Sequence, residues 1–142
     1  DEWVDSLFVF DTLSYLDGVY FVKLGVSDLS SNPPGSELKA EKTSSPLVID
    51  NSLPVVKGFT AARDGSALAV AFQVEDSFSS IEEVEYLIRP GQWRIVFPAD
   101  GVCDSREENF KFRVPLPEKA ENLVTVRVTD RHHNIGVYRQ AY

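Results

Sequence analysis

One acidic loop carries the residue types that bind a metal ion. Between positions 100 and 108 the chain places Asp100, Asp104, Glu107 and Glu108 close together. Calcium takes about six to eight oxygen ligands, which carboxylates can supply. The spacing does not match an EF-hand loop, and Arg106 adds a counter-charge within the segment. We therefore take these four carboxylates as calcium candidates, with a solvated acidic loop as the default interpretation.

The other reactive side chains indicate no catalytic site. Cys103 is the single cysteine, so the chain can form neither an intramolecular disulfide nor a cysteine-based zinc site. The carboxylates beside it should raise the pKa of its thiol and make it a poor nucleophile. Adjacent side chains on a turn point in different directions, so we expect His132 and His133 to be solvated. A Gly-x-Ser-x-Gly elbow and a glycine-rich phosphate loop are both absent from the sequence. We predict no enzyme activity and no cofactor.

An exposed aromatic side chain could provide a carbohydrate platform, and Trp93 is the candidate. It follows the turn Arg89-Pro90-Gly91-Gln92 and heads an expected strand at a sheet edge. Ile95 and Phe97 share its phase, so a position in the core competes with a ligand-binding role. The loop aromatics Phe78 and Tyr15 could extend such a surface.

Composition excludes several partners. The chain has 142 residues and a net charge of −8, which argues against nucleic acid and against docking on anionic lipid. No apolar run approaches the roughly 18 residues of a membrane span, and no signal peptide is visible.

The length of the chain suits one domain or one and a half small ones. The chain starts at Asp1 and contains no methionine, so we interpret it as an excised fragment whose targeting signal lies outside it.

A long internal repeat organises the chain. Positions 102 residues apart match without a gap, and the matches run from Phe8 with Phe110 to Asn32 with Asn134. A period near one hundred residues is typical of whole domains in tandem and is too long for a solenoid, whose repeat is roughly 20–50 residues. The remaining matches pair Phe10 with Phe112, Val22 with Val124, Leu24 with Val126, Val26 with Val128 and Asp28 with Asp130.

Alternation with period two predicts strands along the chain. Residues 54–142 contain about seven short strands separated by turn signals, which is typical of an antiparallel sandwich. We expect no helix there beyond a turn or two. In residues 1–53 we expect strands at 3–10, 19–27 and 46–50, a long loop at 29–46 with a helical turn at 37–42, and a linker ending at Pro54. We also expect Asp28 and Asp130 to close the turns that follow their strands with bonds to backbone N–H groups.

Short motifs along the second half of the chain carry a family resemblance. They are Val74-Glu75-Asp76, Ile81 to Tyr86, Gln92-Trp93, Asp100 to Ser105, Glu108-Asn109-Phe110, and Val126 to Asp130 with Asn134-Ile135-Gly136. With these motifs, residues 54–142 resemble a complete bacterial Ig-like or fibronectin type III-like module. Residues 1–53 resemble the last strands of a preceding module plus a linker. Within them, Leu16-Asp17-Gly18-Val19-Tyr20 resembles the tyrosine corner of such sandwiches, whereas Asn122 stands where the second module would have the tyrosine.

The resemblance implies an all-β fold and a non-catalytic role. Modules of this kind trail β-propellers and other large domains in envelope or secreted bacterial proteins, so it implies an extracytoplasmic location and neighbouring domains as partners. We expect a structural or interaction module, with a carbohydrate- or ligand-binding module using Trp93 as the alternative. The apolar face that includes Val22 and Leu24 needs a cover, which we expect from residues 54–142 or from a second copy in a two-fold dimer.

Overall fold

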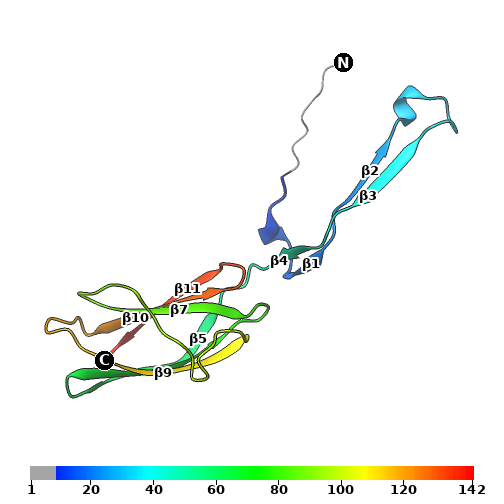
Figure 1. Ribbon diagram of the computed structural model, residues 1–142. Coiled ribbons are helices and arrows are strands. Elements are labelled where there is room, and N and C mark those ends of the chain that lie inside the picture. The colour runs from blue at the N-terminus through cyan, green and yellow to red at the C-terminus, as the bar shows by residue number, and fades with distance from the viewer. Residues whose placement is uncertain (1–8) are drawn as a thin grey trace. The chain divides into compact units, whose positions relative to one another are not determined.

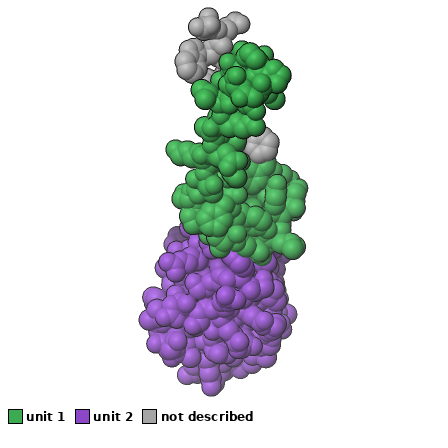
Figure 2. Space-filling model, turned by 90° about the vertical axis from the view of Figure 1, so that its right-hand side faces the viewer, with its two compact units in different colours: residues 1–49 green, residues 50–142 purple. Residues whose placement is uncertain are grey.

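The computed structural model describes residues 9–142. The chain divides into two compact units, residues 1–49 and 50–142 (Figure 2). The boundary lies between Ile49 and Asp50, a few residues before Pro54, where we expected the second module to start. Among the described residues, no helix is long and apolar enough to cross a membrane.

Unit 1 consists of two pairs of antiparallel strands (Figure 1). Strand β1 pairs with β4, and β2 pairs with β3. The elements are η1 (Thr12–Ser14), β1 (Gly18–Tyr20), β2 (Lys23–Ser27), η2 (Leu29–Ser31), β3 (Lys39–Thr43) and β4 (Leu47–Ile49). The Tyr20 hydroxyl donates to the Leu16 carbonyl oxygen at 2.7 Å. This is the hydrogen bond expected of the tyrosine corner at Leu16 to Tyr20.

Three expectations for unit 1 need correction. The expected strand at 3–10 lies mostly outside the described residues, and Val9 and Phe10 are not in a strand. The expected strand at 19–27 is interrupted, because the Val22 N–H donates to the Ser44 hydroxyl at 3.0 Å instead of to a partner strand. The helical turn expected at 37–42 is wrong, because Lys39–Thr43 forms β3. Both faces of β3 are exposed, so its sequence carries no apolar alternation that could have revealed it.

Unit 2 is a two-layered β-sandwich, as the sequence predicted for residues 54–142. One sheet has the order β5-β6-β9 and the other the order β11-β10-β7-β8. All pairs are antiparallel. The strands are β5 (Val55–Asp64), β6 (Ala67–Glu75), β7 (Ile81–Ile88), β8 (Arg94–Ile95), β9 (Glu107–Pro115), β10 (Leu123–Asp130) and β11 (Ile135–Ala141).

The two sheets share one core, and alternation on β6 and β10 supplies much of it. On β10 the side chains of Val124, Val126 and Val128 are fully buried. Facing residues come from β6, where Phe72 stacks on Phe110 of β9 with ring centroids 5.0 Å apart. Each buried valine contributes about 1.5–3 kcal/mol relative to an exposed one. This core fixes the strand ends that carry the polar residues described below.

The edge strand β8 turns its apolar residues the opposite way from our expectation. We grouped Trp93, Ile95 and Phe97 as one inward phase, yet Ile95 and Phe97 are exposed and Val96 is buried. The register explains the reversal, because Ile95 pairs with Glu85 on the outer face of β7. Val96 donates its N–H to the Val84 carbonyl oxygen instead and lies on the core side with that residue.

Candidate metal centre

Three aspartates from distant parts of the sequence meet at one end of the unit 2 sandwich. Asp50 is the first residue of the unit, Asp76 follows directly after β6, and Asp130 is the last residue of β10. One carboxylate oxygen from each residue lies within 4.8 Å of the other two. A search of residues 9–142 for three or more His, Cys, Asp or Glu side chains that could share a metal ion finds this cluster.

Asp76 is held in place through one of its two carboxylate oxygens. Its Oδ1 accepts the backbone N–H groups of Phe78 at 2.8 Å and Ser79 at 2.7 Å. This is the turn that an aspartate after a strand commonly forms. The residue is only 3 % exposed, and its Oδ2 is buried without a hydrogen-bond partner. The Ser79 hydroxyl oxygen is also buried without a partner.

Asp130 closes the turn between β10 and β11, as predicted. Its Oδ1 accepts the backbone N–H groups of His132 at 2.8 Å and Asn134 at 2.9 Å. Its Oδ2 accepts the side-chain amide of Asn134 at 2.9 Å. The residue is fully buried. Asp28 in unit 1 differs from the prediction, since its Oδ1 accepts the N–H of Leu38 at the far end of the loop.

Asp50 joins this group through the turn after β10. The Asn134 side-chain amide donates to the Asp50 carbonyl oxygen at 3.2 Å. The imidazole Nδ1 of His132 lies 2.9 Å from Asp50 Oδ2. The Asp50 side chain is fully buried, although the His132 side chain is 35 % exposed. His132 is therefore engaged with a carboxylate, contrary to our expectation of a solvated turn, whereas His133 is 81 % exposed.

The electrostatics of this end of the sandwich leave the negative charge of the three aspartates only partly compensated, with His132 Nδ1 beside Asp50. Two like charges 4–5 Å apart repel by about 3–4 kcal/mol at an effective dielectric constant near 20. Backbone N–H groups offset part of this cost at Asp76 and Asp130. Among residues 9–142, no lysine or arginine forms an ion pair with any of the three aspartates. The site can therefore accommodate a cation.

The structure does not bring the four predicted calcium candidates together. Asp100, Asp104 and Glu107 are exposed, and Glu108 is buried. Each carboxylate serves as a hydrogen-bond acceptor within or beside the loop. Glu108 Oε1, for example, accepts the N–H groups of Asp104 at 3.1 Å and Ser105 at 2.9 Å. These contacts organise the loop and do not form a common ligand set.

Cys103 has the unreactive surroundings that the sequence indicated. Burial is the largest cause that raises the pKa of its thiol, and the Glu108 carboxylate is the next. Asp100, Asp104 and Glu83 act in the same direction, and the pKa reaches about 11. The thiol is therefore protonated at neutral pH.

Trp93, the predicted ligand residue, is half-buried and engaged by an arginine. The guanidinium carbon of Arg127 lies 4.6 Å from the Trp93 ring centroid. Arg127 also pairs with Glu85. The other two aromatic candidates also have ring partners, since Tyr15 packs edge-on against Tyr20 and Phe78 lies against the His132 ring. A ligand-binding role for Trp93 stays a prediction.

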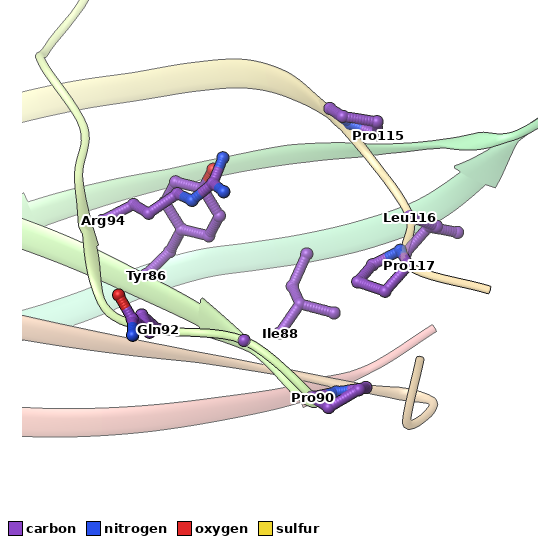
Figure 3. A pocket seen from close by; sticks show the side chains of 9 residues that line it. Tyr86, Ile88, Pro90, Gln92, Arg94, Pro115, Leu116 and Pro117 are labelled. Atoms are coloured by element: carbon purple, nitrogen blue, oxygen red, sulfur yellow. The ribbon is translucent and has the colours of Figure 1, made fainter. Parts of the chain in front are cut away.

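A pocket of about 260 Å³ lies beside the Trp93 hairpin, at the other end of β7 from the aspartates. Figure 3 shows Tyr86, Gln92 and Arg94 on one side and the segment Pro115–Pro117 on the other. Ile88 lies between these two sides, and Pro90 lies below it in this view. The lining combines an aromatic ring, an amide and a guanidinium with apolar rings, but Trp93 itself is not part of it.

Comparison of the chain with protein-family models, with curated proteins and with solved structures finds no match in any of the three. The fold and the candidate sites therefore rest on the residues and contacts described above.

Proposed function

We propose that the chain is a non-catalytic structural or interaction module, a spacer within a larger extracytoplasmic bacterial protein. The observation that carries this proposal is the path of the chain through unit 2. Asp50, where the unit begins, is bonded to Asn134, which follows the last residue of β10. Tyr142 donates its N–H to the carbonyl oxygen of Asn122, which precedes β10, at 3.4 Å.

The chain therefore enters unit 2 at one end of β10 and leaves at the other, as Figure 1 allows the reader to follow. Strand β10 has eight residues, which span about 25 Å in an extended strand. A module with its two ends at opposite poles adds its own length to a tandem array. That property suits a spacer better than an enzyme, whose residues must converge on a substrate.

The strand arrangement supports the proposed Ig-like and fibronectin type III-like relationship. The first, second and fifth strands of unit 2 form one sheet, and the third, sixth and seventh lie in the other. This is the partition of an Ig sandwich. The fourth strand, β8, pairs with the third and not with the fifth, which favours the fibronectin-like variant. The extracytoplasmic location follows from this resemblance alone.

Unit 1 supports a tandem arrangement. Strands β2 and β10 occupy matching positions in the 102-residue register, and each pairs with the strand that follows it. In both, the side-chain amide of the asparagine four residues after the aspartate donates back to that aspartate, from Asn32 to the Asp28 backbone carbonyl oxygen and from Asn134 to the Asp130 carboxylate. Unit 1 therefore has the features expected for the final strands of a second module of the same type.

Lengthening the array tests the spacer proposal. A chain of residues 1–142 followed by an added copy of residues 50–142 would be compared with the original by small-angle X-ray scattering. We expect the maximum dimension to grow by about 25 Å or more for the added copy, from the length of β10. An unchanged maximum dimension, with both copies folded by circular dichroism, would contradict the proposal.

The pocket beside β7 favours one alternative, a ligand-binding module for a carbohydrate or another small polar ligand. Tyr86 offers a ring, and Gln92 and Arg94 offer hydrogen-bond donors. Glycan-array binding tests it. Binding that is lost in Arg94→Ala would favour the pocket, and binding that is lost in Trp93→Ala would favour the platform. Asp64→Ala, at a residue outside both, is the control.

A further inference from the structure

We propose that Asp50, Asp76 and Asp130 together bind a calcium ion. The residues come from three separate segments of unit 2, and their carboxylates meet at the end of the sandwich where the unit begins. This inference does not depend on the spacer proposal, because it concerns what the cluster binds and not what the module does.

The decisive observation is the unused oxygen of Asp76. Asp76 is 97 % buried, and its Oδ2 has no hydrogen-bond partner, although Oδ1 of the same carboxylate accepts two. A buried carboxylate oxygen without a partner is costly and rare in native proteins. Asp76 belongs to the group whose ligand atoms meet. Because its Oδ1 already accepts two N–H groups, Oδ2 is the oxygen that we expect a cation to take. The hydroxyl of Ser79, in the same turn, is also buried without a partner.

The spacing of the group suits a single shared ion. Ligand oxygens on opposite sides of a calcium ion are about 4.6–5.2 Å apart, given the usual metal–oxygen distances. One oxygen from each of the three aspartates lies within 4.8 Å of the others. Asp130 and Asp76 are fixed by backbone N–H groups, so the ligands are preorganised.

The ligand chemistry distinguishes calcium from other metals. Zinc is bound mainly through sulfur and imidazole nitrogen, whereas this group consists of carboxylates. The one nearby imidazole, His132, directs its Nδ1 at Asp50 Oδ2. Magnesium requires near-ideal octahedral geometry and keeps several water molecules, which a site with three buried aspartates does not favour. Calcium accepts irregular sets of carboxylate, hydroxyl and carbonyl oxygens.

Binding would link three parts of unit 2. Asp76 marks the end of β6 in one sheet, and Asp130 marks the end of β10 in the other. Asp50 follows Ile49, the last residue of unit 1. The ion would therefore stabilise the contact between the sheets at this end and fix the residue at which unit 2 starts.

The experiment uses the whole chain, stripped of metal with a chelator, and calcium chloride as the probe. Isothermal titration should give one calcium ion per chain, and the melting temperature should keep rising with free calcium above the dissociation constant. Magnesium chloride at equal concentration should bind at least about tenfold more weakly, since the buried carboxylates suit the larger ion.

A conservative variant tests the unused oxygen directly. In Asp76→Asn the amide oxygen can still accept the N–H groups of Phe78 and Ser79, while an NH₂ group replaces the unpartnered oxygen. We expect the dissociation constant to rise by at least about tenfold, since even residues that only support a metal ligand change affinity by about 10–100-fold. Asp100→Asn is the matched control, because Asp100 Oδ1 likewise accepts an N–H two residues on, from Val102. It should bind calcium unchanged.

Amide NMR spectra guard against a folding artefact. In the original chain, calcium should shift the amide signals of Ser79, His132 and Asn134, and the metal-free spectrum of Asp76→Asn should show the same folded core. Absence of calcium binding at millimolar concentration would overturn the proposal. Binding that survives Asp76→Asn and is lost in Asp100→Asn would overturn it as well, since the ion would then lie in the acidic loop. Equal binding of magnesium would overturn the assignment to calcium.

Discussion

Asp130 and Asn134 are joined by three hydrogen bonds at the end of β10, one of which runs from the Asp130 N–H to the Asn134 carbonyl oxygen. Asp130 Oδ1 accepts the backbone N–H of Asn134, and Oδ2 accepts its side-chain amide, each at 2.9 Å. Between them, His133 has a φ of 66°, in the left-handed region. Asn134 also donates to the Asp50 carbonyl oxygen. This pair therefore shapes the turn, orients the carboxylate of Asp130 and holds the start of unit 2.

We predict that Asp130→Ala destabilises the chain by about 1–3 kcal/mol in the presence of chelator. The substitution leaves two backbone N–H groups without their acceptor, at a cost of about 1–3 kcal/mol each when buried. Relief of repulsion from Asp50 and Asp76 offsets part of that loss. Equilibrium urea unfolding followed by circular dichroism measures the change. Asp28→Ala is the comparison in unit 1, where one bond to Leu38 is lost, and we expect a cost of about 1 kcal/mol or less. Equal stability of the Asp130 variant and the original chain would refute the structural role.

We predict that Gly136→Ala destabilises unit 2 by about 1–3 kcal/mol, the usual cost of overpacking. A Cβ atom at Gly136 would lie 2.7 Å from the Pro54 carbonyl oxygen and 2.8 Å from the Tyr138 ring. The same carbonyl accepts the Tyr138 hydroxyl at 2.6 Å, so neither neighbour can move freely. Thermal unfolding measures the loss. Gly25→Ala, where nothing lies within 4 Å of the added atom, should stay within about 0.5 kcal/mol of the original chain.

We predict that Cys103 reacts slowly with thiol reagents at neutral pH. Burial and the neighbouring carboxylates disfavour the thiolate and raise its pKa to about 11. The rate of reaction should therefore rise about tenfold per pH unit up to that value, because the thiolate is the reactive form. Glu108→Gln keeps the side-chain oxygen that bonds to the loop and removes one charge, so it should lower the pKa of the thiol and speed the reaction. A chain unfolded in urea is the control and should react at the ordinary cysteine rate.

Most strands of unit 2 could be predicted from the sequence, because alternation of apolar and polar residues with period two indicates a strand with one buried face. Strands β6, β7 and β10 alternate cleanly and were predicted. Strand β3 was missed because Lys39–Thr43 is exposed on both faces, so its position depends on pairing with β2 alone. The side of the sheet assigned to Ile95 and Phe97 was wrong, because β8, the strand after Trp93, has only two residues. Alternation over so short a strand does not indicate which face is buried.

The candidate metal centre was harder to predict than the fold. We selected residues 100–108 because four carboxylates lie close together in the sequence there. Closeness in sequence does not make side chains converge on one point when they lie along a loop and a strand. Asp50, Asp76 and Asp130 are scattered along the chain, and each has the local pattern of an ordinary turn residue. Their convergence follows from the order of the strands, which the sequence alone did not determine.

We predict, finally, that the chain self-associates through unit 1. Val22, Leu24 and Val26 are 48 %, 62 % and 55 % exposed, whereas their counterparts on β10 in the repeat register are fully buried under the opposite sheet. A second copy of the chain can supply an equivalent cover, and two-fold dimers are the commonest way of doing so. Sedimentation velocity should show a dimer that forms with increasing concentration.

The double substitution Leu24→Ser and Val26→Ser should weaken the dimer, because it removes apolar area from the face that would be covered. Val137→Ser, at a residue of β11 that is 53 % exposed, is the matched control and should leave the association unchanged. A chain that remains monomeric across the concentration range would contradict the prediction. Dimerisation that is weakened by Val137→Ser and not by the double substitution would place the interface on unit 2 instead.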